Sequence, residues 1–148
     1  MESETLEVDV LVLGAGAAGL SCAIDLARRE KAASRETTIL VLEKGEDIGN
    51  HQLSGAVMDP RGIRELFPDF EALGFPIEAK VEEDRFALLT SGSSYSLKEP
   101  WLPKPLKNNG NFIVSAYKIS RWLKEQAVKA GGKEAGAGNV TTRTAGRR

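Results

Sequence analysis

The chain has 148 residues, 41% of them hydrophobic and 28% charged, an ordinary composition for one globular domain. Lys and Arg total 20 against 21 Asp and Glu, so the net charge of −1 gives no electrostatic basis for binding nucleic acid. Cys22 is the single cysteine, which excludes an internal disulfide and a cluster held by four thiolates of this chain. The acidic start, MESETLEVD, matches neither a secretory signal nor a transit peptide, and no apolar run has membrane-spanning length.

The first part of the chain alternates between strand-like and helix-like patterns. Val8 to Leu13 is an aliphatic run ended by glycine, typical of a strand buried on both faces of a parallel sheet. From Ala17 to Arg29 apolar residues recur at helical spacing, and Cys22 is expected on the buried face of this helix. A second aliphatic run, TTILVLEKG, follows. Residues 8–43 therefore predict a βαβ unit and an α/β fold.

A glycine motif lies at the first strand-to-helix junction. Gly14, Gly16 and Gly19 form G-x-G-x-x-G, in which the glycines permit a tight turn, close approach of a pyrophosphate, and close helix–strand packing. Glu43 ends the second run, near the distance of roughly 20 residues expected for the acidic residue that binds ribose hydroxyls. The motif predicts dinucleotide binding and favours a free 2′-hydroxyl. FAD and NAD share it, so the motif leaves both cofactors open.

The middle of the chain predicts smaller elements. Arg85 to Thr90 and Tyr95 to Leu97 are expected to form a β-hairpin across SGSS. The proline-rich stretch PWLPKPLKNNGN is expected to be extended or looped. Phe112 to Val114 predicts a strand, and Ser115 then caps a helix with one apolar stripe, formed by Ala116, Ile119, Trp122, Leu123 and Ala127.

More specific stretches follow the glycine motif. They are EKGEDIGNHQLSGAVMDPRGIRELFPDF, EDRFALLT and NNGNFIVSAYKISRWLKEQA, in which HQLSGAVMDP and ELFPDF are far more distinctive than the glycines. From about Val8 to Gly131 the chain resembles the N-terminal part of the electron transfer flavoprotein–ubiquinone oxidoreductases. The resemblance implies an incomplete Rossmann-like FAD-binding fold of the glutathione-reductase-like flavoprotein type, with a small β-hairpin insertion.

The resemblance also implies an activity and a location. Members of this family take electrons from reduced electron transfer flavoprotein, pass them through FAD and a 4Fe-4S cluster, and reduce ubiquinone. They do so at a respiratory membrane, either the mitochondrial inner membrane or the bacterial cytoplasmic membrane, as monotopic proteins without a transmembrane helix. The cluster ligands are absent from this chain, which has one cysteine.

Site residues carry over from the family by position. Gly14 to Gly19 are expected at the FAD pyrophosphate, Glu43 at the adenosine ribose, and Lys44 near the adenine. The segment Gly49 to Gly55 is expected to run along the cofactor toward the flavin. Arg121 is the candidate for a basic residue near the phosphates, although a solvated helix face explains it as well. No catalytic residue and no metal ligand is assigned. The complete set of expected cofactor contacts is Gly14, Ala15, Gly16, Ala17, Ala18, Gly19, Glu43, Lys44, His51, Ser54, Gly55 and Arg121.

In the family, the segment that matches residues 48–69 lies against the membrane surface on the way to the quinone. Its apolar residues are compatible with such a contact, but an ordinary buried loop and helix would also use them. They are Leu53, Val57, Met58, Ile63, Leu66, Phe67 and Phe70.

The last part of the chain departs from the family. Residues 131–148, GGKEAGAGNVTTRTAGRR, contain one aliphatic side chain larger than Ala, namely Val140. We expect no strand of the parallel sheet here and a disordered, non-family tail, after an FAD-binding part at residues 1–130. Two alternatives to the quinone reductase stay open. One is a non-catalytic fragment that binds ADP or FAD, without reductase activity of its own, and the other is the Rossmann domain of another FAD or NAD oxidoreductase.

Overall fold

The computed structural model describes residues 7–53, 55–97, 101–130, 132–134 and 140–143. The chain divides into two compact units. The first consists of Met1–Ser54 and Ala116–Arg148, and the second of Gly55–Ser115. The expected FAD-binding part at residues 1–130 thus spans both units, and residues 55–115 have an apolar core of their own.

The first unit is built on the predicted βαβ motif. Strand β1 (Val10–Leu13), helix α1 (Ala17–Ala32) and strand β2 (Thr38–Leu42) follow one another, and the two strands pair in parallel. The register aligns Val10 with Ile39 and Leu13 with Leu42. This pairing confirms the βαβ prediction and brings the carboxyl ends of both strands to one edge of the sheet.

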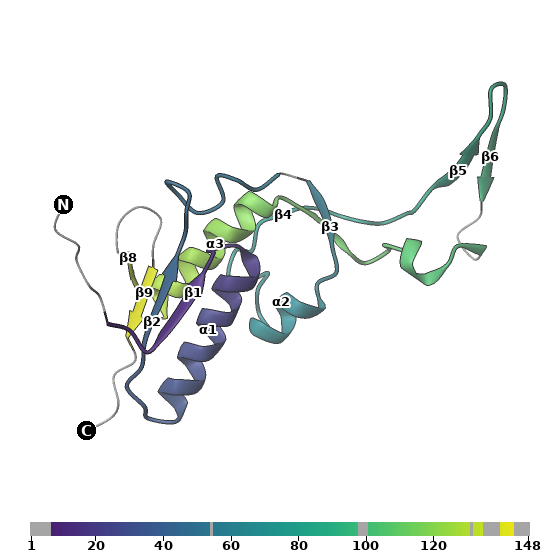
Figure 1. Cartoon of the computed structure of the whole chain (residues 1–148). Helices are drawn as coiled ribbons and strands as arrows, with labels where there is room; N and C mark the ends of the chain where they lie inside the picture. The colour runs from purple at the N-terminus through teal and green to yellow at the C-terminus, as the bar shows by residue number, and fades with distance from the viewer. Residues whose placement is uncertain (1–6, 54, 98–100, 131, 135–139, 144–148) are drawn as a thin grey trace. The chain divides into compact units, whose positions relative to one another are not determined.

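Two helices cover one face of this sheet (Figure 1). Helix α3 (Ala116–Lys129) contacts α1, and both helices contact strands of the sheet. Helix α3 begins directly after Ser115, as predicted. Its buried side chains include most of the predicted stripe and two polar residues that the apolar pattern did not indicate, Ser120 and Gln126. The core between helices and strands is aliphatic, with Leu20, Ile24, Ile39, Val41 and Leu123 almost fully buried.

Two details of the first unit differ from expectation. Leu11 and Leu13 of β1 are 49% and 77% exposed, so within the described residues this strand is not buried on both faces. Cys22 is exposed and does not belong to the inner face of α1. The buried stripe of α1 is Leu20, Ala23, Ile24 and Ala27. Two helical steps from Leu20 amount to about 200° of rotation, which places Cys22 on the opposite side.

The end of the chain contributes strands to the same sheet. Strand β8 (Gly132–Glu134) and strand β9 (Val140–Arg143) pair with each other, and β9 pairs antiparallel with β2. The sheet order is β1-β2-β9-β8. The expectation that this segment forms no strand is therefore wrong for these residues. The sequence argument considered a parallel strand buried on both faces, whereas the β-branched run VTT suits an antiparallel pairing that needs less apolar surface.

Two glycines at the junction of β1 and α1 stand where other residues are disfavoured, Gly14 because of its backbone conformation and Gly19 because of the space around it. Gly14 has φ of +98°, in the region that favours glycine, and its N–H donates to the carbonyl oxygen of Leu42 at 2.7 Å. A Cβ added at Gly19 would overlap the carbonyl oxygen of Gly14 and would also meet the Val12 side chain at 3.2 Å. Gly19 therefore allows α1 to pack directly against the end of β1, as the motif predicts.

The second unit has a three-stranded antiparallel sheet. Strands β3 (Ala56–Met58) and β4 (Ile77–Lys80) pair with the two sides of β7 (Phe112–Val114), in the order β3-β7-β4. Helix α2 (Arg61–Leu66) follows β3. The rings of Phe70 and Phe75 meet edge to face with centroids 5.4 Å apart, and Phe70 lies 6.0 Å from Phe112. These aromatic contacts form the core of the unit.

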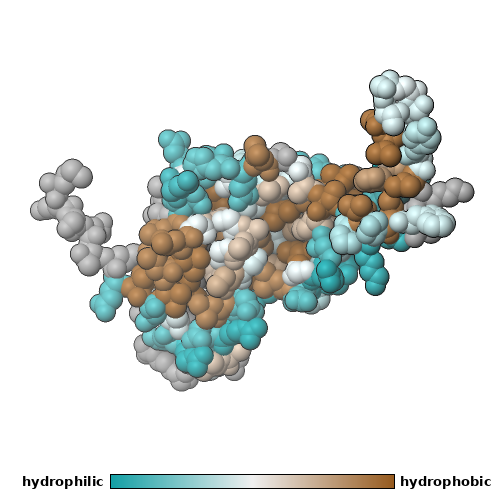
Figure 2. Space-filling model, turned by 45° about the vertical axis from the view of Figure 1, so that its right-hand side comes forward, coloured by the Kyte–Doolittle hydropathy of each residue, from teal (hydrophilic) through white to brown (hydrophobic). Residues whose placement is uncertain are grey.

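The predicted hairpin is present in the second unit. Strands β5 (Phe86–Leu89) and β6 (Ser94–Leu97) pair with each other only, and all of their residues are exposed. Directly paired residues share a face, so one face of the hairpin is apolar. Its residues are Phe86, Leu88, Tyr95 and Leu97. Apolar surface is visible on the hairpin in Figure 2. The proline-rich stretch is largely irregular but contains a short 3-10 helix, Lys104–Leu106, which the sequence did not predict.

The expected membrane-facing segment, residues 48–69, falls across both units. Leu53 and Val57 are 91% and 52% exposed, whereas Phe67 and Phe70 are buried. Those two aromatic residues therefore belong to the core of the second unit and not to a surface. Among the described residues, no helix has the length and the apolar character needed to cross a membrane.

We predict that Gly19→Ala destabilises the first unit. The new methyl group would overlap a backbone carbonyl that cannot rotate away, and overpacking of this kind costs about 1–3 kcal/mol. Thermal unfolding should show a lower midpoint for this variant. Gly62→Ala is the matched control, because a Cβ at this helical glycine meets open space and alanine favours the helix. Equal midpoints for Gly19→Ala and the wild type would contradict the close packing.

We predict that an acidic tether, formed by Glu30 near the end of α1 with Arg35 and Thr37, makes the free energy of unfolding depend on pH. Glu30 accepts hydrogen bonds from Arg35 at 2.6 and 2.7 Å and from Thr37 at 2.9 Å. These partners, Arg35 first, lower the pKa of Glu30 to about 2. Because the pKa is depressed in the folded state, the carboxylate stabilises the fold above its unfolded pKa. That contribution is lost as the pH falls toward 2.

Thermal unfolding of Glu30→Gln between pH 2 and pH 7 tests this tether. The variant should unfold at a lower temperature than the wild type near pH 7, and the gap should shrink below about pH 4.3, the ordinary pKa of Glu. Glu36→Gln, at an exposed neighbouring position, should show no such trend. A gap for Glu30→Gln that stays constant down to pH 2 would argue against the tether.

Candidate functional site

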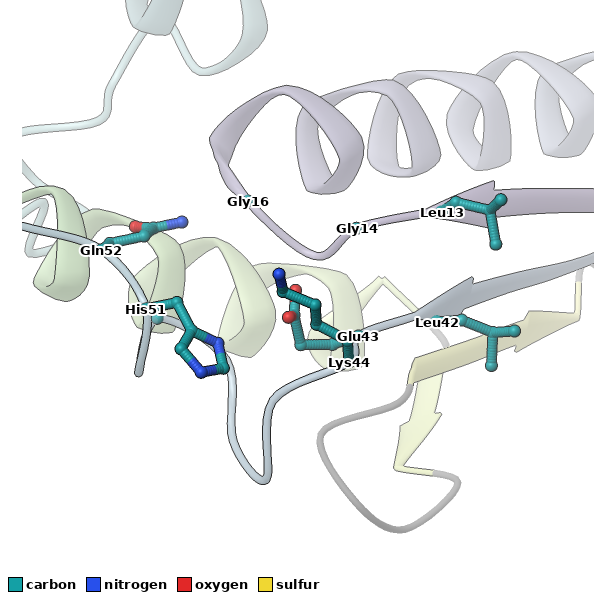
Figure 3. Close-up of a pocket in the computed structure, with 9 residues that line it drawn as sticks. Leu13, Gly14, Gly16, Leu42, Glu43, Lys44, His51 and Gln52 are labelled. Atoms are coloured by element: carbon teal, nitrogen blue, oxygen red, sulfur yellow. The ribbon is translucent and has the colours of Figure 1, made fainter.

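A pocket opens at the carboxyl ends of β1 and β2, within the first unit (Figure 3). Its volume is about 640 Å³, within the range of small-molecule sites. Ligands of open α/β sheets bind at this edge, where the strands end and the loops begin. The lining residues are Leu13, Gly14, Gly16, Leu42, Glu43, Lys44, Gly49, His51 and Gln52.

The N-terminus of α1 forms one wall of the pocket. Gly16 is the N-cap residue of α1 and, as a glycine, has no side chain that could accept a hydrogen bond from the first N–H groups. The first turn of the helix contains no acidic residue. The first N–H groups of a helix lack partners within the helix and, with the helix dipole, favour an anion. This end of α1 therefore has the properties of a phosphate-binding site.

Glu43 connects the end of β2 to the glycine loop. Its Oε2 accepts a hydrogen bond from the Ala15 N–H at 2.9 Å, and its Oε1 accepts one from the Gly45 N–H at 3.0 Å. These backbone bonds, that of Gly45 first, lower the pKa of Glu43 below its ordinary value. The carboxylate is therefore ionised at neutral pH. A carboxylate has about four lone-pair sites and can accept several hydrogen bonds at once, and ribose hydroxyls are donors of the matching kind.

The loop from Lys44 to Gln52 is attached to α3. Asp47 lies 3.3 Å from Nζ of Lys124 and 3.2 Å from Nη1 of Arg121. The Ile48 N–H first, and then Lys124, hold the pKa of Asp47 below its usual value. Asp47 and Lys124 are both partly buried, so this pair is shielded from solvent more than a surface ion pair and attaches the loop to α3.

Packing and one buried hydrogen bond complete this attachment. Gly49 has φ of +92°, and a Cβ there would meet the Tyr117 ring at 2.8 Å. Ser120 donates a hydrogen bond from Oγ to Oε1 of Gln52 at 2.7 Å, between positions 68 residues apart in the sequence. The loop is thereby held beside the glycine loop from which the first turn of α1 begins.

The structure brings most of the predicted cofactor contacts together. Five of them line the pocket, namely Gly14, Gly16, Glu43, Lys44 and His51. Ala15 donates to Glu43, while Ala17 and Ala18 lie in the first turn of α1, and Gly19 packs that turn on β1. His51 lies beside Gly45, with its ring 3.1 Å from the position of a Cβ there.

The other three predicted contacts have different outcomes. Arg121 donates to the Tyr117 hydroxyl at 2.5 Å and pairs with Asp47, and it is not among the lining residues. Gly55 belongs to the second unit. Ser54 is outside the described residues. Four lining residues are absent from the predicted contacts, namely Leu13, Leu42, Gly49 and Gln52. Gly49 and Gln52 do belong to the segment expected along the cofactor, but the hydrogen bond of Gln52 to Ser120 on α3 is too remote in sequence for a local pattern to reveal.

The pocket fits the ADP part of a dinucleotide better than it fits a metal ion. It combines free helix N–H groups for phosphate, a glycine where the backbone must be approached, and an ionised carboxylate for ribose. Among the described residues, no group of three or more His, Cys, Asp or Glu side chains is placed to hold a metal ion.

The chain is similar to known flavoproteins. Residues 9–58 match the family model described as "FAD dependent oxidoreductase". The electron transfer flavoprotein–ubiquinone oxidoreductase of Pseudomonas aeruginosa is 44% identical over 129 residues, which cover 86% of this chain and 23% of that protein. The mitochondrial protein of the same name from Homo sapiens is 42% identical over 132 residues, 88% of this chain and 21% of that protein. The mitochondrial protein of the same name from Dictyostelium discoideum is 42% identical over 125 residues, which cover 84% of this chain and 20% of that protein.

The chain thus spans about a fifth of the length of these curated relatives, which fits an N-terminal part. The matching region includes Gly14, Gly16, Glu43, His51 and Gln52, which line the pocket. The resemblance noted from the sequence is confirmed: over most of its length this chain is related to part of the electron transfer flavoprotein–ubiquinone oxidoreductases.

Proposed function

We propose that the first unit binds FAD, with the pyrophosphate at the N-terminus of α1 and the adenosine ribose at Glu43. The observation that carries this proposal is the Glu43 carboxylate, bonded to the Ala15 N–H and ionised, beside a helix N-terminus without a side-chain cap. The match to the FAD-dependent oxidoreductase family favours FAD over NAD. On this proposal the fold is of the glutathione-reductase-like type.

Other residues have supporting roles in this proposal. Lys44 lies at the rim of the adenine end, and His51 helps to shape the loop beside it. For Ser54 and Gly55, a contact along the cofactor toward the flavin rests on the family resemblance alone. Arg121 would reach the phosphates only if its contacts with Asp47 and Tyr117 broke. With these contacts formed, its role is to attach the loop that contains Asp47 to α3.

We further propose that the chain is part of an enzyme that carries electrons from reduced electron transfer flavoprotein to ubiquinone at a respiratory membrane. The names of the relatives support this flow of electrons. The chain would supply the ADP end of the FAD site. A 4Fe-4S cluster would require ligands beyond the single cysteine of these residues. The exposed side chains of Leu53 and Val57 are the remaining support for a membrane contact within residues 48–69.

Binding of FAD, ADP and NAD to the 148-residue chain, measured by calorimetry, tests the cofactor assignment. FAD and ADP should bind, and Glu43→Gln should weaken both about tenfold or more, because charge-assisted hydrogen bonds contribute about 1.5–3 kcal/mol. Glu46→Gln, an exposed carboxylate of the same loop, is the matched control and should bind as the wild type does. NAD binding tighter than FAD binding would instead assign the pocket to a nicotinamide enzyme.

We predict that the 148-residue chain alone does not reduce ubiquinone. With FAD and reduced electron transfer flavoprotein supplied, quinone reduction should not exceed the rate without the chain, since one cysteine cannot hold a cluster. The assay is the absorbance of a quinone analogue under anaerobic conditions. Turnover by the purified chain would show that these residues suffice for electron transfer.

A further inference from the structure

The side chain of Gln52 lies where a pyrophosphate would approach the glycine loop. Its Nε2 is 3.3 Å from the position that a Cβ on Gly16 would occupy. Gln52 lines the pocket and is half-buried. In Figure 3 its amide nitrogen points toward the loop that contains Gly16. An uncharged donor therefore faces the same space as the free N–H groups of α1.

The orientation of this amide is set by α3. The Oγ of Ser120 donates to Oε1 of Gln52 at 2.7 Å, and Ser120 is 0% exposed. An amide has one acceptor end and one donor end, so a hydrogen bond received at Oε1 directs Nε2 away from α3. Among the described residues, none accepts a hydrogen bond from Nε2, so as far as these residues go both of its N–H groups can bind an acceptor in the pocket.

The backbone of Gln52 is held as firmly as its amide. Its N–H donates to the Gly49 carbonyl oxygen at 2.9 Å, in a turn whose glycine packs on Tyr117. Asp47, two positions before that glycine, is paired with Lys124. The donor therefore needs little rearrangement to bind a ligand, and preorganisation of this kind increases affinity.

We propose that Gln52 is a further ligand of the cofactor pyrophosphate and that Ser120 is its positioning residue. This inference rests on the proposed function, because it assigns a ligand to the same pocket. Nε2 donates one or both of its N–H groups to a phosphate oxygen, beside the N–H groups of the first turn of α1. The contact is made to phosphate. Adenosine has no phosphate and therefore makes no hydrogen bond to Gln52.

The test compares ADP with adenosine on the 148-residue chain by calorimetry. Gln52→Glu keeps the acceptor that Ser120 needs and replaces the donor by a second oxygen, which repels phosphate. ADP binding should weaken about tenfold or more, while adenosine binding stays within about twofold. Gln52→Ala removes the amide without adding charge and should give a smaller loss for ADP alone.

Asn50→Asp is the matched control for Gln52→Glu. It makes the same change from amide to carboxylate two positions away in the same loop, at an exposed residue that does not line the pocket. It should leave the ratio of ADP to adenosine affinity unchanged. Thermal unfolding of each variant shows that the comparison is made on folded protein.

Ser120→Ala tests the positioning role. Loss of the hydroxyl should weaken ADP binding several-fold without changing adenosine binding, and it should have no further effect on that ratio in the Gln52→Glu background. A merely structural role would lower both affinities and would add to the effect of Gln52→Glu.

The outcomes separate this inference from the proposed function. Wild-type binding of ADP that Gln52→Glu and Gln52→Ala leave unchanged would overturn the role of Gln52 and keep the FAD site. Absence of ADP and FAD binding by the folded wild-type chain would overturn both. Equal losses of ADP affinity for Asn50→Asp and Gln52→Glu would show that the negative charge added to the loop causes the effect. That result would also contradict a contact between Gln52 and the phosphate.

Discussion

The hydrogen bond between the Ala15 N–H and the Glu43 carboxylate is the constraint on which the pocket depends. It joins the glycine loop after β1 to the end of β2, across 28 positions of sequence, and leaves the ionised carboxylate at the edge where both strands end. Close packing at Gly19 then places the first turn of α1 beside it. An anion-binding helix end and a hydrogen-bond acceptor for ribose are thereby held in one pocket.

Helix α3 acts on this pocket through the loop after β2. The pairing of Asp47 with Lys124 and the contact of Gly49 with Tyr117 fix the course of the loop. These contacts also give Arg121 a role that the helical pattern alone did not favour. Its guanidinium neutralises Asp47, so the charge on this helix orients a loop and does not line the pocket.

The sequence predicted the βαβ unit, the hairpin and the pocket glycines because each depends on local spacing. The prediction that Cys22 is buried was wrong, because residue type alone does not set the side of a helix. The rotation from Leu20 turns Cys22 away from the buried stripe of α1. The prediction of no strand at β9 was also wrong, because strand formation was tied to aliphatic content. A strand that pairs with the edge of a sheet needs backbone N–H and C=O groups more than apolar side chains. The edge that β9 pairs with exists only once β2 is part of the sheet.

By itself the sequence determined the glycine loop, the position of Glu43 after the second strand, and the relation to a family of flavoproteins. These follow from residue type and spacing over short distances. Only the tertiary structure decided that residues 55–115 form a separate unit and that Phe67 and Phe70 lie in its core. It alone paired Ser120 with Gln52, because a hydrogen bond between positions 68 residues apart has no local pattern and exists only after α3 packs beside the loop.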